Sequence, residues 1–146
     1  MKAKPKTDKD PSCKARWKSH KDSRVSALRD MFERMSSDND ARREEAMQDF
    51  SEYGLSFDYV APETFNDQPE GYWRYQISWG GPSEEFRFYS SSYKHRPYRI
   101  EFWFLDWGNG HGRALAGDDL ETLLRVWDDF DDMSATESEF RRATDL

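Results

Sequence analysis

Apolar and polar residues alternate through the middle of the chain, between Gly71 and Trp107, as they do in β-strands. Turn-forming residues divide this stretch into three alternating segments, at residues 72–79, 85–89 and 98–107. Trp, Tyr and Phe supply most of the apolar positions, and each such ring removes roughly 150–250 Å² from water when it is buried. We therefore expect an antiparallel sheet with these rings in the core of the protein.

Two neighbouring segments carry weaker signals. Residues 55–59 alternate briefly before Pro62, which is typical of a short edge strand. Residues 108–112 contain three glycines, which favours a flexible turn. Together with the three longer segments, this pattern predicts a meander of three or four strands.

Apolar residues at a spacing of three and four predict helices before and after the sheet. Two helices are expected before it, with apolar stripes at Val25, Leu28, Phe32 and Met35 and at Ala46, Met47, Phe50 and Tyr53. Gly54 fits a left-handed C-terminal cap of the second helix. A third helix is expected from about Asp118, whose side chain would cap its N-terminus. The predicted fold class is α+β, with two N-terminal helices, the meander and a C-terminal acidic helix in one domain over residues 25–146.

The composition narrows the class of protein. A chain of 146 residues, 16% of them aromatic, is long enough to bury a core within one domain. Cys13 is the only cysteine, which excludes an intramolecular disulfide and a multi-cysteine metal site. No apolar run approaches the length of a membrane span, and the charged N-terminus lacks the apolar core of a secretory signal. We expect a cytoplasmic protein that does not associate with membranes.

The net charge of −7 is distributed unevenly along the chain. Residues 1–24 hold nine Lys or Arg against three Asp, whereas residues 118–146 hold three basic against ten acidic residues. The first segment has too few apolar residues to offset its chain entropy, so we expect a basic arm that is disordered in isolation. The favoured interpretation is a solubilising tail, or an arm that folds back on the acidic body. The alternative is a nucleic-acid contact, with cations on phosphates and an indole on a base, through Lys14, Arg16, Trp17 and Lys18.

Carboxylates gather along the last predicted helix. Those expected to contact a partner are Asp118, Asp119, Glu121, Asp128, Asp129 and Asp132. Clustered carboxylates can dock on a basic protein or take the positions of phosphates in a nucleic-acid-binding groove. An ordinary solvated helix face explains the same pattern, and the sequence leaves both interpretations open.

Three arginines lie on the polar face of the expected sheet, at Arg74, Arg87 and Arg99. With the neighbouring glutamates they are interpreted as cross-strand ion pairs, and the alternative is a site for an anion or a peptide. Asp106 and His111 flank a glycine-rich turn, but a lone histidine lacks a second positioned base or nucleophile. No phosphate-binding loop, zinc-ligand spacing or nucleophile elbow occurs. We therefore expect no cofactor, no metal and no enzymatic activity.

The segment GYWRYQISWGGPSEEFRFY and the later RIEFWFLDW resemble a pattern in small uncharacterised proteins of bacterial plasmids and other mobile elements, over about residues 70–132. The resemblance implies an accessory protein that helps such an element survive in its host. Together with the acidic helix, it predicts a non-enzymatic interaction module that binds a basic host or plasmid protein. The most specific version of this prediction is a protein that inhibits a nucleic-acid-binding defence complex of the host by mimicking DNA. The alternative prediction is a nucleic-acid-binding accessory protein that acts through the basic arm.

Overall fold

The structure, a computed structural model, describes the backbone of residues 3–145 and the side chains of residues 14–145. Within these residues the elements follow the order α1 (Ala3–Met35), α2 (Asp40–Tyr53), β1 (Ser56–Val60), β2 (Tyr72–Ser78), β3 (Ser83–Tyr89), β4 (Arg99–Asp106), β5 (Asn109–Ala114), α3 (Gly117–Asp132) and α4 (Ala135–Thr144). The predicted α+β class is confirmed. None of the described helices is both long enough and apolar enough to cross a membrane.

The strands form one antiparallel sheet in the order β1-β2-β3-β4-β5, so each strand pairs with the next one in the sequence. The sheet has five strands rather than three or four, because the glycine-rich segment expected to be a flexible turn forms β5. Only Trp107 and Gly108 lie between β4 and β5, and both have positive φ, as in the type I′ turns that close two-residue hairpins.

The glycines of β5 serve packing rather than flexibility. Gly112 pairs with Trp103, and a Cβ added at Gly112 would lie 2.1 Å from the Trp103 ring. Gly110 pairs with Leu105, and a Cβ there would lie 2.6 Å from the Leu105 side chain. Larger residues in β5 would collide with the side chains of β4, which lie across the strand.

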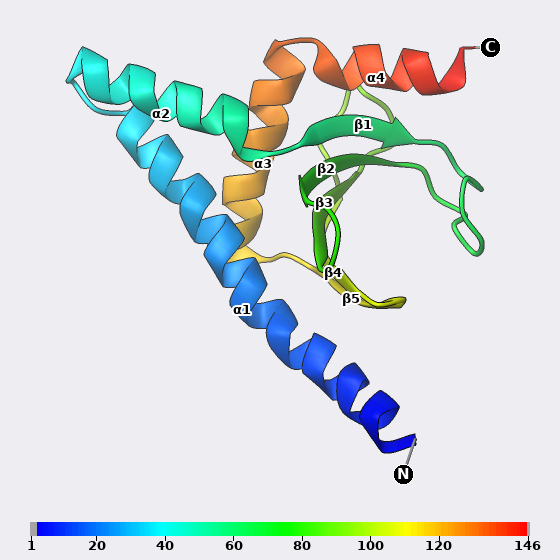
Figure 1. Cartoon of the computed structure of the whole chain (residues 1–146). Helices are drawn as coiled ribbons and strands as arrows, with labels where there is room; N and C mark the ends of the chain where they lie inside the picture. The colour runs from blue at the N-terminus through cyan, green and yellow to red at the C-terminus, as the bar shows by residue number, and fades with distance from the viewer. Residues whose placement is uncertain (1–2, 146) are drawn as a thin grey trace.

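Helices α1 and α3 cover one face of the sheet, and α4 packs along β1 (Figure 1). The sheet contributes aromatic rings to the core, and α1 and α3 contribute mainly aliphatic side chains together with Trp127. At most 1% of the surface of each central ring is exposed, at Trp73, Phe86, Phe88, Phe102, Phe104 and Trp127. The prediction that these rings fill the interior is confirmed.

Tyr98 and Trp107, which are 63% and 83% exposed, are exceptions to that prediction, and so is Trp79. Its position in the alternation placed it beside Trp73 on the covered face, yet 75% of its surface is exposed. The register between β2 and β3 shifts between Gln76 and Ser78, so the alternation ends before Trp79 and the residue falls in the β2–β3 turn.

Helix α1 begins far earlier than the apolar stripe indicated. It runs from Ala3, and residues 14–24 pack on the sheet and on α3. Residue 25 therefore does not mark the start of the folded structure. The physical reason is helical spacing: Trp17, His20 and Arg24 lie along the side of α1 that faces the sheet, where they find partners more than 50 residues away in the sequence.

The C-terminal region also differs from expectation. Helix α3 starts at Gly117 after the N-cap residue Ala116, and no side chain caps it, so the predicted Asp118 cap is wrong. A further helix, α4, follows the acidic helix. The indole nitrogen of Trp73 donates a hydrogen bond to the carbonyl of Thr136 at 2.9 Å, which anchors the start of α4 to the core.

Gly54 follows α2 with φ of −91°, so the predicted left-handed cap is wrong. A Cβ at this position would lie 2.1 Å from the ring of Tyr75, which is buried. Close approach to a ring, and not backbone conformation, therefore calls for glycine here.

The variant Gly54→Ala should lower the free energy of unfolding by about 1–3 kcal/mol, because the buried Tyr75 ring must shift. Urea unfolding followed by circular dichroism measures this loss. Gly81→Ala is the matched control, since a Cβ there makes only an ordinary 3.8 Å contact with Asp106. Equal effects of the two substitutions would contradict the packing explanation.

Candidate functional site

An apolar groove of about 780 Å³ opens between α2, the start of β1 and the C-terminal half of α3. Its floor is aromatic: the rings of Phe57 and Phe130 stack with centroids 4.1 Å apart, and Tyr75 meets Phe130 edge-on at 5.1 Å. Its rim carries Met47, Leu55 and Met133, each with more than half of its surface exposed. Long apolar side chains exposed around an aromatic floor are typical of a surface that binds another molecule.

Charged side chains of both signs line the groove. The guanidinium of Arg125 lies over the ring of Phe32 at 4.4 Å, and Arg43 donates to the carbonyl of Ser37 at 2.8 Å. Both cations are therefore already held by contacts within the protein.

Asp129 and Asp132 of α3 are the acidic residues that line the groove. Burial raises the pKa of Asp129, and the nearby Asp132 and Asp128 raise it further, while Arg125 acts in the opposite direction. Among the described residues, no cation lies within ion-pair distance of either carboxylate. A cation brought by a binding partner would stabilise the charged form of Asp129.

The other carboxylates predicted to contact a partner point elsewhere. Asp119 accepts from Lys21 at 2.6 Å and from Arg29 at 3.2 Å, which ties α3 to α1. Asp128 forms a two-pronged pair with Arg96 at 3.0 and 3.2 Å. Asp118 and Glu121 are exposed at the other end of α3. The structure thus brings two of the six predicted residues, Asp129 and Asp132, together at the groove and disperses the rest.

The three predicted arginines do share the face of the sheet that α1 and α3 leave uncovered, but each is paired with a carboxylate. Arg74 contacts Asp58 of the adjacent strand through two hydrogen bonds at 2.8 and 3.1 Å. Arg87 and Arg99 instead pair with Glu85 and Glu101 two residues away on their own strands. The expected cross-strand pairing therefore holds only for Arg74.

Aromatic rings complete this uncovered face. The guanidinium of Arg87 lies 4.2 Å from the ring of Trp103 and 4.8 Å from that of Tyr72, and burial raises the pKa of Tyr72 to about 12. A cavity of about 450 Å³ opens here beneath the β1–β2 loop. An anion would have to displace a carboxylate to reach any of the three arginines, so the anion or peptide site stays a prediction from the sequence.

Of the four residues predicted to contact nucleic acid, two are exposed and two are held by contacts within the fold. Lys14 and Lys18 are exposed, and Arg16 pairs with Asp106 at 3.0 Å. Trp17 is half-buried: its indole nitrogen donates to the carbonyl of Phe102 at 2.7 Å. The ring expected to stack on a base is therefore engaged with the sheet.

Sequence reasoning missed a charged cluster under α1. Only 2% of the Glu84 side chain is exposed, and its carboxylate accepts from Arg24 at 2.6 Å, from Ser78 at 2.8 Å and meets His20 at 2.8 Å. Burial alone would raise the pKa of Glu84, but these hydrogen bonds outweigh burial and hold the pKa below its ordinary value. His20 and Arg24 lie about 60 residues from Glu84 in the sequence, so no local pattern identifies them as its partners.

In the cluster around Glu84, the hydroxyl of Ser78 and the ring of His20 each contact the carboxylate rather than each other. His111 and Asp106, near the β4–β5 turn, each have a different partner. Arg113 donates to His111 at 3.1 Å, whereas Asp106 pairs with Arg16. Among residues 14–145 no group of three or more His, Cys, Asp or Glu side chains is placed to hold a metal ion.

Comparison with known proteins finds no matching family model, no matching curated protein and no matching solved structure. The resemblance to proteins of plasmids and other mobile elements therefore stays a prediction, and the function is argued from the geometry of the chain alone.

Proposed function

We propose that this protein is a non-enzymatic binding module whose groove holds an amphipathic helical segment of a basic partner protein. Such segments bind by inserting apolar side chains spaced three, four and seven residues apart into an apolar groove. Met47, Leu55 and Met133 offer adaptable apolar contacts of the kind found at peptide-binding surfaces. Asp129 and Asp132 offer charge to a lysine or arginine beside the apolar stripe of the partner.

The observation that carries the proposal is the joint presence of exposed apolar side chains and a partly buried carboxylate without a cation in ion-pair distance among the described residues. Each feature costs free energy in the isolated protein, and both costs are relieved by the same partner. DNA mimicry and a role in a mobile element remain predictions from the sequence. The pairing of Asp119 and Asp128 with arginines and a lysine leaves fewer free carboxylates for mimicry.

A display library of random peptides, selected on the full chain, tests the proposal. Enriched peptides should be amphipathic helices with Lys or Arg flanking the apolar stripe. Replacing both Asp129 and Asp132 with Asn, or Met47 with Ser, should weaken a selected peptide about tenfold.

Asp118→Asn combined with Glu121→Gln is the matched control, because it changes the net charge of α3 equally at exposed positions away from the groove. Binding that falls equally in both double variants would show a diffuse charge effect and contradict the site. Failure to enrich any amphipathic basic peptide would overturn the proposed function.

A further inference from the structure

The methionines that solvent can reach are gathered at the groove. The structure describes the side chains of four methionines, and three of them, Met35, Met47 and Met133, line the groove. The fourth, Met31, is buried, with 5% of its surface exposed. The three groove methionines come from α1, α2 and the C-cap of α3, so the fold brings them together and no local sequence pattern does.

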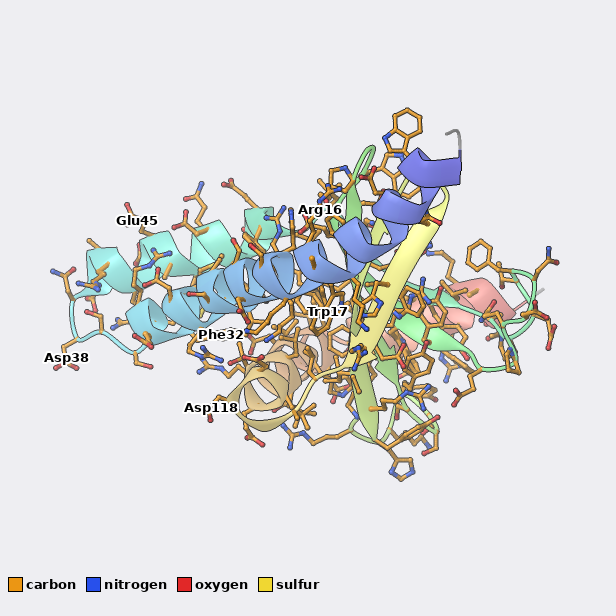
Figure 2. All side chains as sticks on the ribbon, turned by 90° about the horizontal axis from the view of Figure 1, so that it is seen from below. Arg16, Trp17, Phe32, Asp38, Glu45 and Asp118 are labelled. Atoms are coloured by element: carbon orange, nitrogen blue, oxygen red, sulfur yellow. The ribbon has the colours of Figure 1, made fainter. Side chains whose placement is uncertain are left out.

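Met47 and Met133 are the most accessible of the three. Their exposed fractions are 55% and 63%, whereas Met35 is half-buried. Figure 2 shows α2 alongside the C-terminal half of α1, and Ala46, the residue before Met47, is the one buried residue of α2. Met133 is the C-cap residue of α3, and its backbone N–H donates to the carbonyl of Asp129. The backbone of both residues is therefore fixed, while their thioethers are open to small solutes.

A thioether in such a position reacts directly with a peroxide. The sulfur attacks one oxygen of hydrogen peroxide, the S–O bond forms as the O–O bond breaks, and the other oxygen leaves as water with both hydrogens. The sulfur loses two electrons and the peroxide gains them. The product, methionine sulfoxide, replaces a flexible apolar side chain with a polar one. Because the reaction requires access to the sulfur, Met47 and Met133 should react first, then Met35, and Met31 last.

We propose that Met47 and Met133 form a redox-sensitive modification site, through which hydrogen peroxide releases the partner bound in the groove. This inference rests on the proposed function, because it concerns the same rim. Each sulfoxide places a polar oxygen where the apolar stripe of the partner must exclude water, so contacts are lost on two walls of the groove. The aromatic floor contains no sulfur, and we expect the oxidised protein to keep its fold and lose the partner.

The modification is reversible. Methionine sulfoxide reductases return both epimers of the sulfoxide to the thioether, and the exposure that admits peroxide also leaves these side chains accessible to an enzyme. Leucine, which occupies the third exposed position of the rim at Leu55, has a similar volume but no such chemistry. Two methionines therefore give the rim an apolar state that binds and a polar state that does not.

Peptide mapping by mass spectrometry tests the modification on the full chain without any partner. The chain is treated with hydrogen peroxide, catalase removes the excess, and the sulfoxide fraction at each methionine is followed over time. Met47 and Met133 should be oxidised at least about tenfold faster than Met31, because their sulfurs are exposed. Rates at Met47 and Met133 no higher than at Met31 would overturn the proposal.

Fluorescence anisotropy tests the consequence for binding, with a peptide from the display selection that lacks Met and Cys. The oxidised chain should bind this peptide about tenfold more weakly, and a mixture of both classes of methionine sulfoxide reductase with dithiothreitol should restore the affinity. Dithiothreitol alone, which reduces an oxidised Cys13 but not a sulfoxide, should not restore it. Circular dichroism should show an unchanged fold, and unfolding on oxidation would contradict an effect confined to the groove.

The variant that carries Met47→Leu and Met133→Leu is compared with itself before and after peroxide. Its affinity should change by less than about twofold, since leucine is not oxidised. Met31→Leu is the matched control, because it removes a buried methionine and should keep the full sensitivity to peroxide.

The outcomes separate this inference from the proposed function. A selected peptide that binds the oxidised chain as well as the reduced one would overturn the inference and leave the proposed function standing. Equal sensitivity to peroxide in the leucine double variant and in the unaltered chain would do the same. Failure to select any peptide would overturn both.

Discussion

A chain that begins at residue 25 should be at least about 5 kcal/mol less stable than one that begins at residue 14, and should fail to fold cooperatively. The shorter chain loses Trp17, whose hydrogen bond to β4 and packing on Phe102 tie α1 to the sheet. It also loses His20 and Arg24, which cover the carboxylate of Glu84 and pair with it. Loss of a large packed aromatic side chain such as Trp17 alone costs about 3–5 kcal/mol.

Urea unfolding of the two truncated chains measures this difference. Their comparison isolates residues 14–24, because both lack residues 1–13. Equal stability of the two chains would show that residues 14–24 are the dispensable arm that their composition indicates.

This result also decides how nucleic-acid binding is tested. Deleting residues 1–24 would remove the basic residues and the stability of the sheet together, so lost binding would not identify a contact. Point substitutions at the exposed positions Lys14 and Lys18 leave the packed side of α1 intact. They separate a phosphate contact from a structural one.

Hydrophobic periodicity was sufficient for the parts of the fold whose residues pack through their own pattern. Strand β4 alternates in sequence and in burial, and the stripe of α3 meets the sheet as its spacing predicts. The buried face of these elements can be predicted from the local sequence. When a ring recurs at every second or fourth position, only one orientation of the element removes all of these rings from water.

The wrong structural predictions concern residues whose role depends on a partner far away in the sequence. The glycines of β5 indicate flexibility until Trp103 and Leu105 are known to lie across the strand. The lysines and arginines of residues 14–24 indicate a solvated tail until Glu84 and Asp106 appear opposite them. A shift in the register between β2 and β3, which the sequence does not mark, moved Trp79 from the core to a turn.

In the candidate sites, too, some residues could be predicted from the sequence and others are brought together only by folding. Charge clustering identified Asp129 and Asp132, because acidic residues late in a helix oppose its dipole and stand out in the sequence. It did not identify Met47, Leu55 and Met133, which come from three separate segments and form a rim only after folding.

Arg24→Leu should lower the free energy of unfolding at neutral pH by about 3 kcal/mol, because it removes the main cation facing the buried carboxylate of Glu84. His20, Ser78 and, through Arg24, Tyr53 are the other polar groups of this cluster. Arg29→Leu is the matched control on the same helix. Its partner Asp119 is more exposed, so a loss of about 0–1 kcal/mol is expected.

The pH dependence of the two proteins should have opposite sign. In the unaltered chain the pKa of Glu84 is held below its ordinary value, so the stability from this group is present above the unfolded pKa of about 4.3 and is lost as the pH falls through the folded pKa. Without Arg24, burial should raise the pKa of Glu84 above that of the unfolded chain. The deficit of the variant should therefore be largest at neutral pH and shrink as acid protonates the carboxyl group. Urea unfolding across this pH range measures both trends, and a deficit that is constant with pH, or equal to that of Arg29→Leu, would show that Glu84 does not depend on Arg24.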